Sequence, residues 1–177
     1  FGLQRTYAFT DDDLSAQEEA RRALSEMVEL IRTSRQPDPA TVPEALRGLV
    51  IVQAANNRLT CFTDVDRDAD HELELTQFRV DTEERTLFRD TDLAHSNDLA
   101  FSTAGSVRLV GRWVSNNGDS EDEYLFTYKG MHGLPLAMTT GVDPMTGEPE
   151  TQVADPSQIR EITIKLLIDI DTERAPI

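Results

Sequence analysis

The chain has 177 residues, of which 38% are hydrophobic and 28% charged, a balance typical of one soluble globular domain and not of a disordered chain. Its 33 acidic and 17 basic residues give a net charge of −16, which disfavours binding to nucleic acid or to an anionic membrane, because both require a basic face. The charge instead favours cations and basic protein surfaces as partners. Its simplest role is to keep the protein soluble, and adaptation to salt would give the same balance.

The first predicted element is an amphipathic helix over residues 14–35. Its apolar residues recur at helical spacing, and no Gly or Pro interrupts it. A capping box that begins at Ser15 would start the helix there. The alternative is a helix that already begins at Phe1. Pro37 ends the helix in either case. The predicted apolar stripe consists of Ala20, Leu24, Met27, Val28 and Ile31.

After position 39 the hydrophobic period changes from helical to alternating, which predicts strands. The alternation slips once near Thr76 and Gln77, so a bulge is expected there. The Gly- and Pro-containing stretch 130–156 is predicted to be a loop. The expected strands, about six or seven in all, lie at 48–54, 58–63, 72–80, 86–89, 107–114, 124–128 and 159–170.

The order of these elements predicts an α+β fold in which the N-terminal amphipathic helix packs on an antiparallel β-sheet. No internal repeat or linker divides the chain. We therefore expect a single domain over residues 1–177, with the helix in 1–36 and a β-rich part in 48–170.

An acidic loop joins the second and third predicted strands. Its carboxylates fall at positions one, three, five, seven and nine of a calcium-binding loop, where they repel one another unless a cation intervenes. The sixth position is Ala69 instead of Gly, and the twelfth is Leu75 instead of Glu. These departures favour a solvated hairpin loop, and a calcium site is the competing hypothesis. The candidate ligands are Asp64, Asp66, Asp68, Asp70 and Glu72.

Other polar residues predict neither a zinc site nor a catalytic site. His71, His95 and His132 lack the spacing that zinc ligands use. No glycine-framed nucleophile and no phosphate-binding glycine loop is present. The acidic run 121–123 adjoins Asn-Gly turn chemistry and is most simply a charged loop. We therefore expect a protein that is not an enzyme and that has no cofactor, calcium being the one exception considered.

Three aromatic residues and one cysteine complete the candidates. Trp113, Phe126 and Tyr128 could form a platform for a sugar, but their alternation with polar residues favours packing in or near the core. Cys61, the single cysteine, lies in a predicted strand beside apolar residues. It is therefore predicted to be a small buried residue and not a reactive thiol.

Taken in order, these segments resemble the minor pilins of type IV pili, and especially the J-type minor pseudopilins with a prepilin-type N-terminus. Two departures from that family are the residues Arg67 and Ala69, where relatives often carry glycines, and the lone Cys61, which cannot supply a C-terminal disulfide. The segments that carry the resemblance are the helix at 16–24 and 29–32, the aspartate loop and strands at 62–70, 78–80 and 86–89, the hairpin at 107–117 and 125–128, and the last strand at 159–166.

The resemblance implies a headgroup on a helix whose membrane-spanning first half is missing from this chain. A start at Phe1 instead of Met, and the lack of an apolar run of about 20 residues, would then both be explained. The implied function is that of a structural minor subunit of a type IV pilus or a type II secretion-like pseudopilus. Such a subunit acts by filament or tip-complex assembly, in protein secretion or DNA uptake.

The same resemblance implies the partners and the location. The partners would be other pilin or minor pseudopilin subunits, with no nucleic acid bound directly and membrane contact only through the missing N-terminal helix. The protein would be extracytoplasmic, anchored in the inner membrane before assembly and then part of a cell-surface filament. The alternative is a secreted binding module, calcium-dependent or not, that recognises a surface or a carbohydrate.

Overall fold

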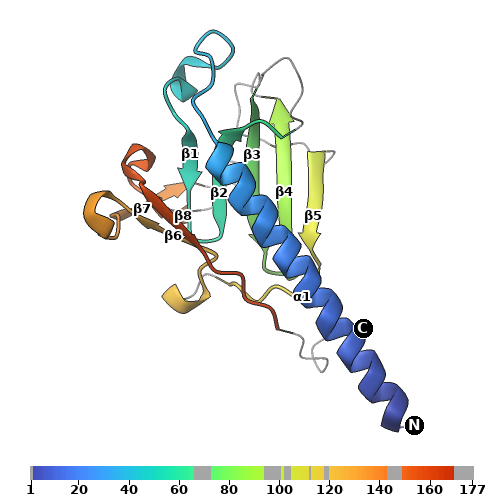
Figure 1. Cartoon of the computed structure of the whole chain (residues 1–177). Helices are drawn as coiled ribbons and strands as arrows, with labels where there is room; N and C mark the ends of the chain where they lie inside the picture. The colour runs from blue at the N-terminus through green and yellow to red at the C-terminus, as the bar shows by residue number, and fades with distance from the viewer. Residues whose placement is uncertain are drawn as a thin grey trace.

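The computed structural model describes residues 2–65, 73–93, 101, 105–111, 113–117, 120–142 and 149–169, with side chains from Leu14 onward except Ala45 and Leu93. A long helix, α1 (Gly2–Thr33), crosses one face of a five-stranded antiparallel sheet (Figure 1). Two smaller two-stranded sheets lie beside it. The α+β prediction of one helix packed on an antiparallel sheet is confirmed. In the described part of the chain, no helix combines the length and apolar character needed to span a membrane.

Helix α1 begins at Gly2, so the start predicted at Ser15 is wrong and the earlier start is confirmed. No residue between positions 3 and 33 is a Gly or Pro, so nothing in the local sequence breaks the helix before Ser15. At the other end, the Thr33 and Ser34 hydroxyls both donate to the carbonyl of Leu30 at 3.1 Å. These bonds satisfy a carbonyl of the last turn, and Pro37 follows before the helix could resume.

Strands in chain order build the large sheet as a meander, and the remaining strands form two separate pairs. The nine strands of the described residues exceed the predicted six or seven, because the stretch 130–156 contains a hairpin that was predicted to be a loop. The large sheet contains β1 (Ile51–Ala54), β2 (Arg58–Thr63), β3 (Glu74–Asp81), β4 (Thr86–Leu93) and β5 (Ser106–Val110), while β6 (Phe126–Lys129) pairs with β9 (Glu161–Ile164) and β7 (Met138–Val142) pairs with β8 (Pro149–Val153).

The expected bulge near Thr76 and Gln77 is wrong, because β3 pairs with β2 and β4 there without a shift in register. The alternation slips for a different reason: β3 is apolar on both faces. Phe78 lies on the face toward α1, in the main core. Leu75 lies on the opposite face and packs with Phe62 in a second cluster. The strand therefore changes its apolar face partway along without a break in pairing.

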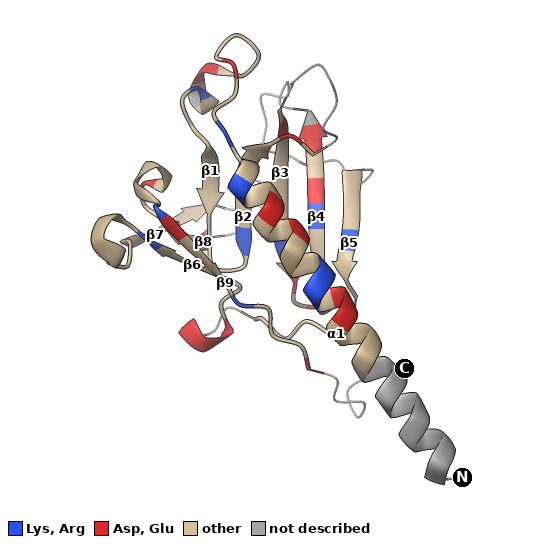
Figure 2. Cartoon of the chain, in the orientation of Figure 1, with Lys and Arg blue, Asp and Glu red and all other residues tan. Residues whose placement is uncertain are grey.

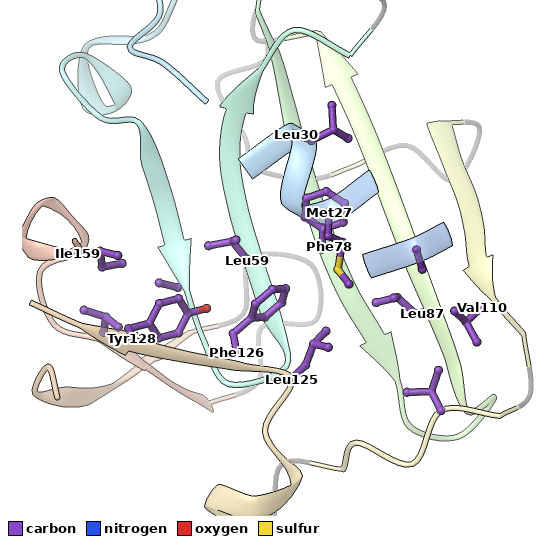
Figure 3. Close-up of a cluster of buried hydrophobic side chains, with 14 residues drawn as sticks. Met27, Leu30, Leu59, Phe78, Leu87, Val110, Leu125, Phe126, Tyr128 and Ile159 are labelled. Carbon is purple, nitrogen blue, oxygen red and sulfur yellow. The ribbon is translucent and has the colours of Figure 1, made fainter. Parts of the chain in front are cut away.

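The main core lies between α1 and the large sheet, and the C-terminal strands close one side of it (Figure 3). Met27 of α1 is fully buried above Phe78 and Leu87. The predicted stripe is only partly right, because Leu24 and Ile31 are half-buried on its flank. The buried line of α1 consists of Ala16, Ala20, Ala23, Met27 and Leu30.

Candidate functional site

The entrance of the acidic loop lies against the end of α1. The Asp64 carboxylate is 3.5 Å from the guanidinium of Arg35, just beyond the helix. Thr63, the last residue of β2, donates its hydroxyl to the carbonyl of Leu30 at 3.1 Å. Across the sheet, Glu74 is only 6% exposed, and its carboxylate accepts the N–H of Val65 at 2.7 Å. Helix end and loop entrance therefore form one hydrogen-bonded unit.

The calcium hypothesis stays a prediction. Of the five candidate ligands, the structure describes only Asp64, and the other four lie outside the described residues. Within the described ranges, no three His, Cys, Asp or Glu side chains come together as a metal site would require. Sequence reasoning missed Glu74, which follows the loop on the face of β3 that points to α1. The sequence signal for Glu74 was its spacing from Phe78, because residues separated by an even number of positions lie on the same face of a strand.

A polar row crosses the face of the large sheet that points away from α1. One residue from each strand pairs in register with the next, and all but the last are at most 5% exposed. The Gln77 amide donates to the Thr60 hydroxyl at 3.1 Å, and the Ser106 hydroxyl donates to Asp90. The row consists of Gln53, Thr60, Gln77, Asp90 and Ser106.

Ionic pairs extend this row on both sides. The Arg79 guanidinium donates to Asp90 at 2.6 Å and lies 4.6 Å from the ring centre of Phe88. The Glu150 carboxylate of β8 accepts from Gln53 at 2.8 Å and lies 3.6 Å from Arg58. The contacts of Glu150 connect the β7–β8 hairpin to the sheet, because a carboxylate that is largely removed from water needs partners. The sequence signal for the polar row was the presence of polar residues at alternate positions of the strands. Prediction of the strands alone did not show that these residues would be buried together.

The aromatic candidates are structural. Phe126 and Tyr128 are buried, and their rings stack with centroids 6.4 Å apart. The Tyr128 hydroxyl donates to the Ala55 carbonyl at 2.7 Å, and burial raises the pKa of Tyr128 well above its usual value. Trp113 is half-buried against the same cluster. Packing in and around the core is confirmed, and these rings form no open platform for a sugar.

Cys61 is buried, as predicted. The Ser34 hydroxyl oxygen lies 3.4 Å from its sulfur, and burial raises the pKa of the Cys61 thiol to about 11. A thiol that stays protonated is a poor nucleophile. Of the three histidines, only His132 is described, on the exposed turn η4 (Met131–Gly133). The run Glu121–Glu123 forms an exposed 3₁₀ turn, η3, as expected of a charged loop.

Where its side chains are described, the outer face of α1 carries both acidic and basic residues (Figure 2). Two of its carboxylates connect it to the sheet: Glu26 pairs with Arg89 of β4, and Glu19 accepts the N–H of Gly111 at 3.2 Å. Ala16 is buried, whereas Leu14 is 54% exposed, and the helix runs on past the sheet (Figure 1).

Comparisons with protein-family models, with curated proteins and with solved structures each find no match to this chain. The geometry of the described residues is therefore the basis of the functional argument.

Proposed function

We propose that this protein is a non-enzymatic, pilin-like minor subunit of a type IV pilus or pseudopilus-like filament, extracytoplasmic and assembled with other pilin or minor pseudopilin subunits. One observation carries the proposal: the N-terminal end of α1 extends past the sheet on which the helix packs (Figure 1). At a rise of about 1.5 Å per residue, its 32 residues reach about 48 Å. The residues before the buried Ala16 account for about 20 Å of the helix, and its N-terminal part extends past the sheet (Figure 1).

An extension of this kind favours packing against other molecules. An isolated helix of about 14 residues is marginal in water, because helices of that length depend on tertiary packing for their stability. Leu14, exposed at the start of the packed part, gives an apolar side chain for such a contact. The sheet and its loops then lie to one side of the helix, where a headgroup would meet neighbouring subunits.

The test is incorporation of variants into filaments or tip complexes in the native host, expressed from the full-length gene. Leu14→Asp places a charge on the proposed contact, and we expect incorporation to fall at least tenfold. Ser15→Asp is the matched control, because Ser15 is exposed on the next helical position. Both variants should have the melting temperature of the wild type, since neither residue is buried. Equal incorporation of the two variants, or normal filaments and secretion after deletion of the gene, would refute the proposal.

The gene sequence upstream of Phe1 separates this proposal from a secreted binding module. A filament subunit requires a short basic leader, a cleavage site and about 20 apolar residues there. A binding module requires only a signal peptide or a linker.

A further inference from the structure

Strand β7 (Met138–Val142) has an unusual edge for a native sheet. It pairs with β8 on one side, and no other strand of the described residues pairs with its outer side. Four of its five residues are exposed, and none is charged or a proline. Native edge strands are commonly protected by Lys, Pro, a bulge or a covering segment, because their open N–H and C=O groups otherwise recruit another strand.

The pairing of β7 defines which backbone groups point outward. The N–H of Ala154 donates to the carbonyl of Ala137 at 3.0 Å, so these two residues form a hydrogen-bonded pair. Hydrogen-bonded pairs recur at every second residue along an antiparallel ladder. Pro149 lies opposite Val142, at a position where no N–H is needed for pairing with β7, and this agrees with its lack of an N–H. The N–H and C=O groups of Met138, Thr140 and Val142 therefore point to the outer edge.

Apolar side chains gather around this edge. Met138 and Val142 share one face of β7 and are 39% and 62% exposed. The preceding turn adds Met131 and Leu134, at 67% and 64% exposed. An open hollow of about 300 Å³ lies next to Met138, with Tyr124 and Leu136 in its wall. Exposed apolar side chains beside an unprotected strand edge are typical of a surface for protein binding.

The negative charge of the protein indicates which kind of partner binds at this edge. The chain carries a net charge of −16, and the wholly acidic turn η3 contributes Glu121 to the same hollow. Lys129 also lines the hollow, but its ammonium pairs with Glu161 at 2.6 Å. A second copy of this chain would bring the same negative charge, which opposes edge-to-edge pairing. A segment with basic residues next to apolar ones would be attracted.

We infer that the outer edge of β7 binds an extended, basic and apolar segment of another protein by strand addition. Main-chain bonds to Met138, Thr140 and Val142 supply the pairing, and the hollow beside Met138 receives an apolar side chain of the segment. In Figure 1 this edge lies at the left of the molecule, away from the N-terminal end of α1. It does not depend on the filament proposal, and the Leu14 and Ser15 variants do not test it.

The experiment uses two synthetic peptides of about eight residues, long enough to span the strand. One alternates valine and lysine, and the other alternates valine and glutamate. Amide chemical shifts of the isotope-labelled protein locate the binding and give the affinity. At low salt we expect the lysine peptide to bind at least tenfold tighter than the glutamate peptide, with the largest shifts at 138–142. Absence of binding, or shifts centred elsewhere, would overturn the inference.

Two variants test the main-chain contact. Thr140→Pro removes one outward N–H while leaving the bonds to β8, and we expect at least a tenfold loss of affinity for the lysine peptide. Thr140→Ser keeps that N–H and should bind within twofold of the wild type. Equal affinities of these two variants would show that the edge is not used.

A second substitution tests the inference independently, in case the proline variant does not fold. Val142→Lys adds a charge at an exposed position, so the fold should persist, as its melting temperature would verify, while the lysine peptide is repelled. Unchanged affinity of this variant would also count against the inference. Sedimentation of the wild type checks the other occupant: a dimer that Thr140→Pro dissolves would assign the edge to a second copy and overturn the proposal of a basic partner.

Discussion

Replacing Met27 by Ala should destabilise the protein far more than replacing Leu24 by Ala. Met27 is fully buried between α1 and the sheet, whereas Leu24 is half-buried on the flank. Removing a fully buried Met costs about 3 kcal/mol, from lost burial and the remaining cavity. The half-buried Leu should cost about 1 kcal/mol. Ala is the best helix former, so a loss of helix propensity explains neither cost.

In thermal unfolding, these values convert to shifts of roughly 9 °C for Met27→Ala and roughly 3 °C for Leu24→Ala, at about 3 °C per kcal/mol for a chain of this size. Urea titration gives the free energies directly, provided that unfolding is two-state. Circular dichroism checks that both variants keep the helix. If Leu24→Ala costs as much as Met27→Ala, or if Met27→Ala costs less than about 1 kcal/mol, then α1 does not lie on the sheet as described.

Three further predictions concern metal, pH and a buried amide. If the acidic loop binds calcium, millimolar calcium should raise the melting temperature, and the double change Asp66→Ala with Asp68→Ala should abolish the rise; identical melting with calcium and with chelator would leave the solvated loop standing. Because burial raises the pKa of Cys61 from 9.0 to about 11, the unfolded state loses this proton first, so stability should fall as pH rises from 9 to 11, by at most about 3 kcal/mol from this group. Urea midpoints at pH 8 and pH 10.5 should differ less in Cys61→Ala than in the wild type, and an equal difference would contradict the assignment. Asn116, which is 1% exposed, donates to Glu123 and Lys165 carbonyls and accepts from the Leu167 N–H. Asn116→Ala should therefore cost about 3 kcal/mol in urea unfolding, and a cost below 0.5 kcal/mol would exclude these bonds as stabilising contacts.

Strands with a short-range signal were predictable from the sequence. β2 has the predicted bounds, because an Asn-Asn turn precedes Arg58 and the acidic loop follows Thr63. The start of α1 was not predictable from the sequence, because a good capping residue such as Ser15 is also tolerated inside a helix. The β7–β8 hairpin was missed for a related reason. Its strands carry Thr, Gly and Pro, and β7 is mostly exposed while β8 buries only Val153, so no apolar alternation marks them.

The candidate site was less predictable than the fold. Glu74 and the polar row depend on which face of each strand is buried, and this is decided by tertiary packing and not by spacing along the chain. A strand such as β3, with Leu75 on one face and Phe78 on the other, gives a pattern that a bulge would also give. Only the pairing of its neighbours separates the two interpretations.

The two apolar faces of β3 have a consequence for how the protein opens. A slip of one residue in its pairing would exchange both faces at once, placing Phe78 and Leu75 each in the wrong cluster. Local fluctuations of β3 should therefore be rare, since they would disrupt both clusters together. In native-state hydrogen exchange, we expect the amides of β2, β3 and β4 to be the last to exchange, at the free energy of global unfolding, while those of the exposed β7–β8 hairpin exchange early.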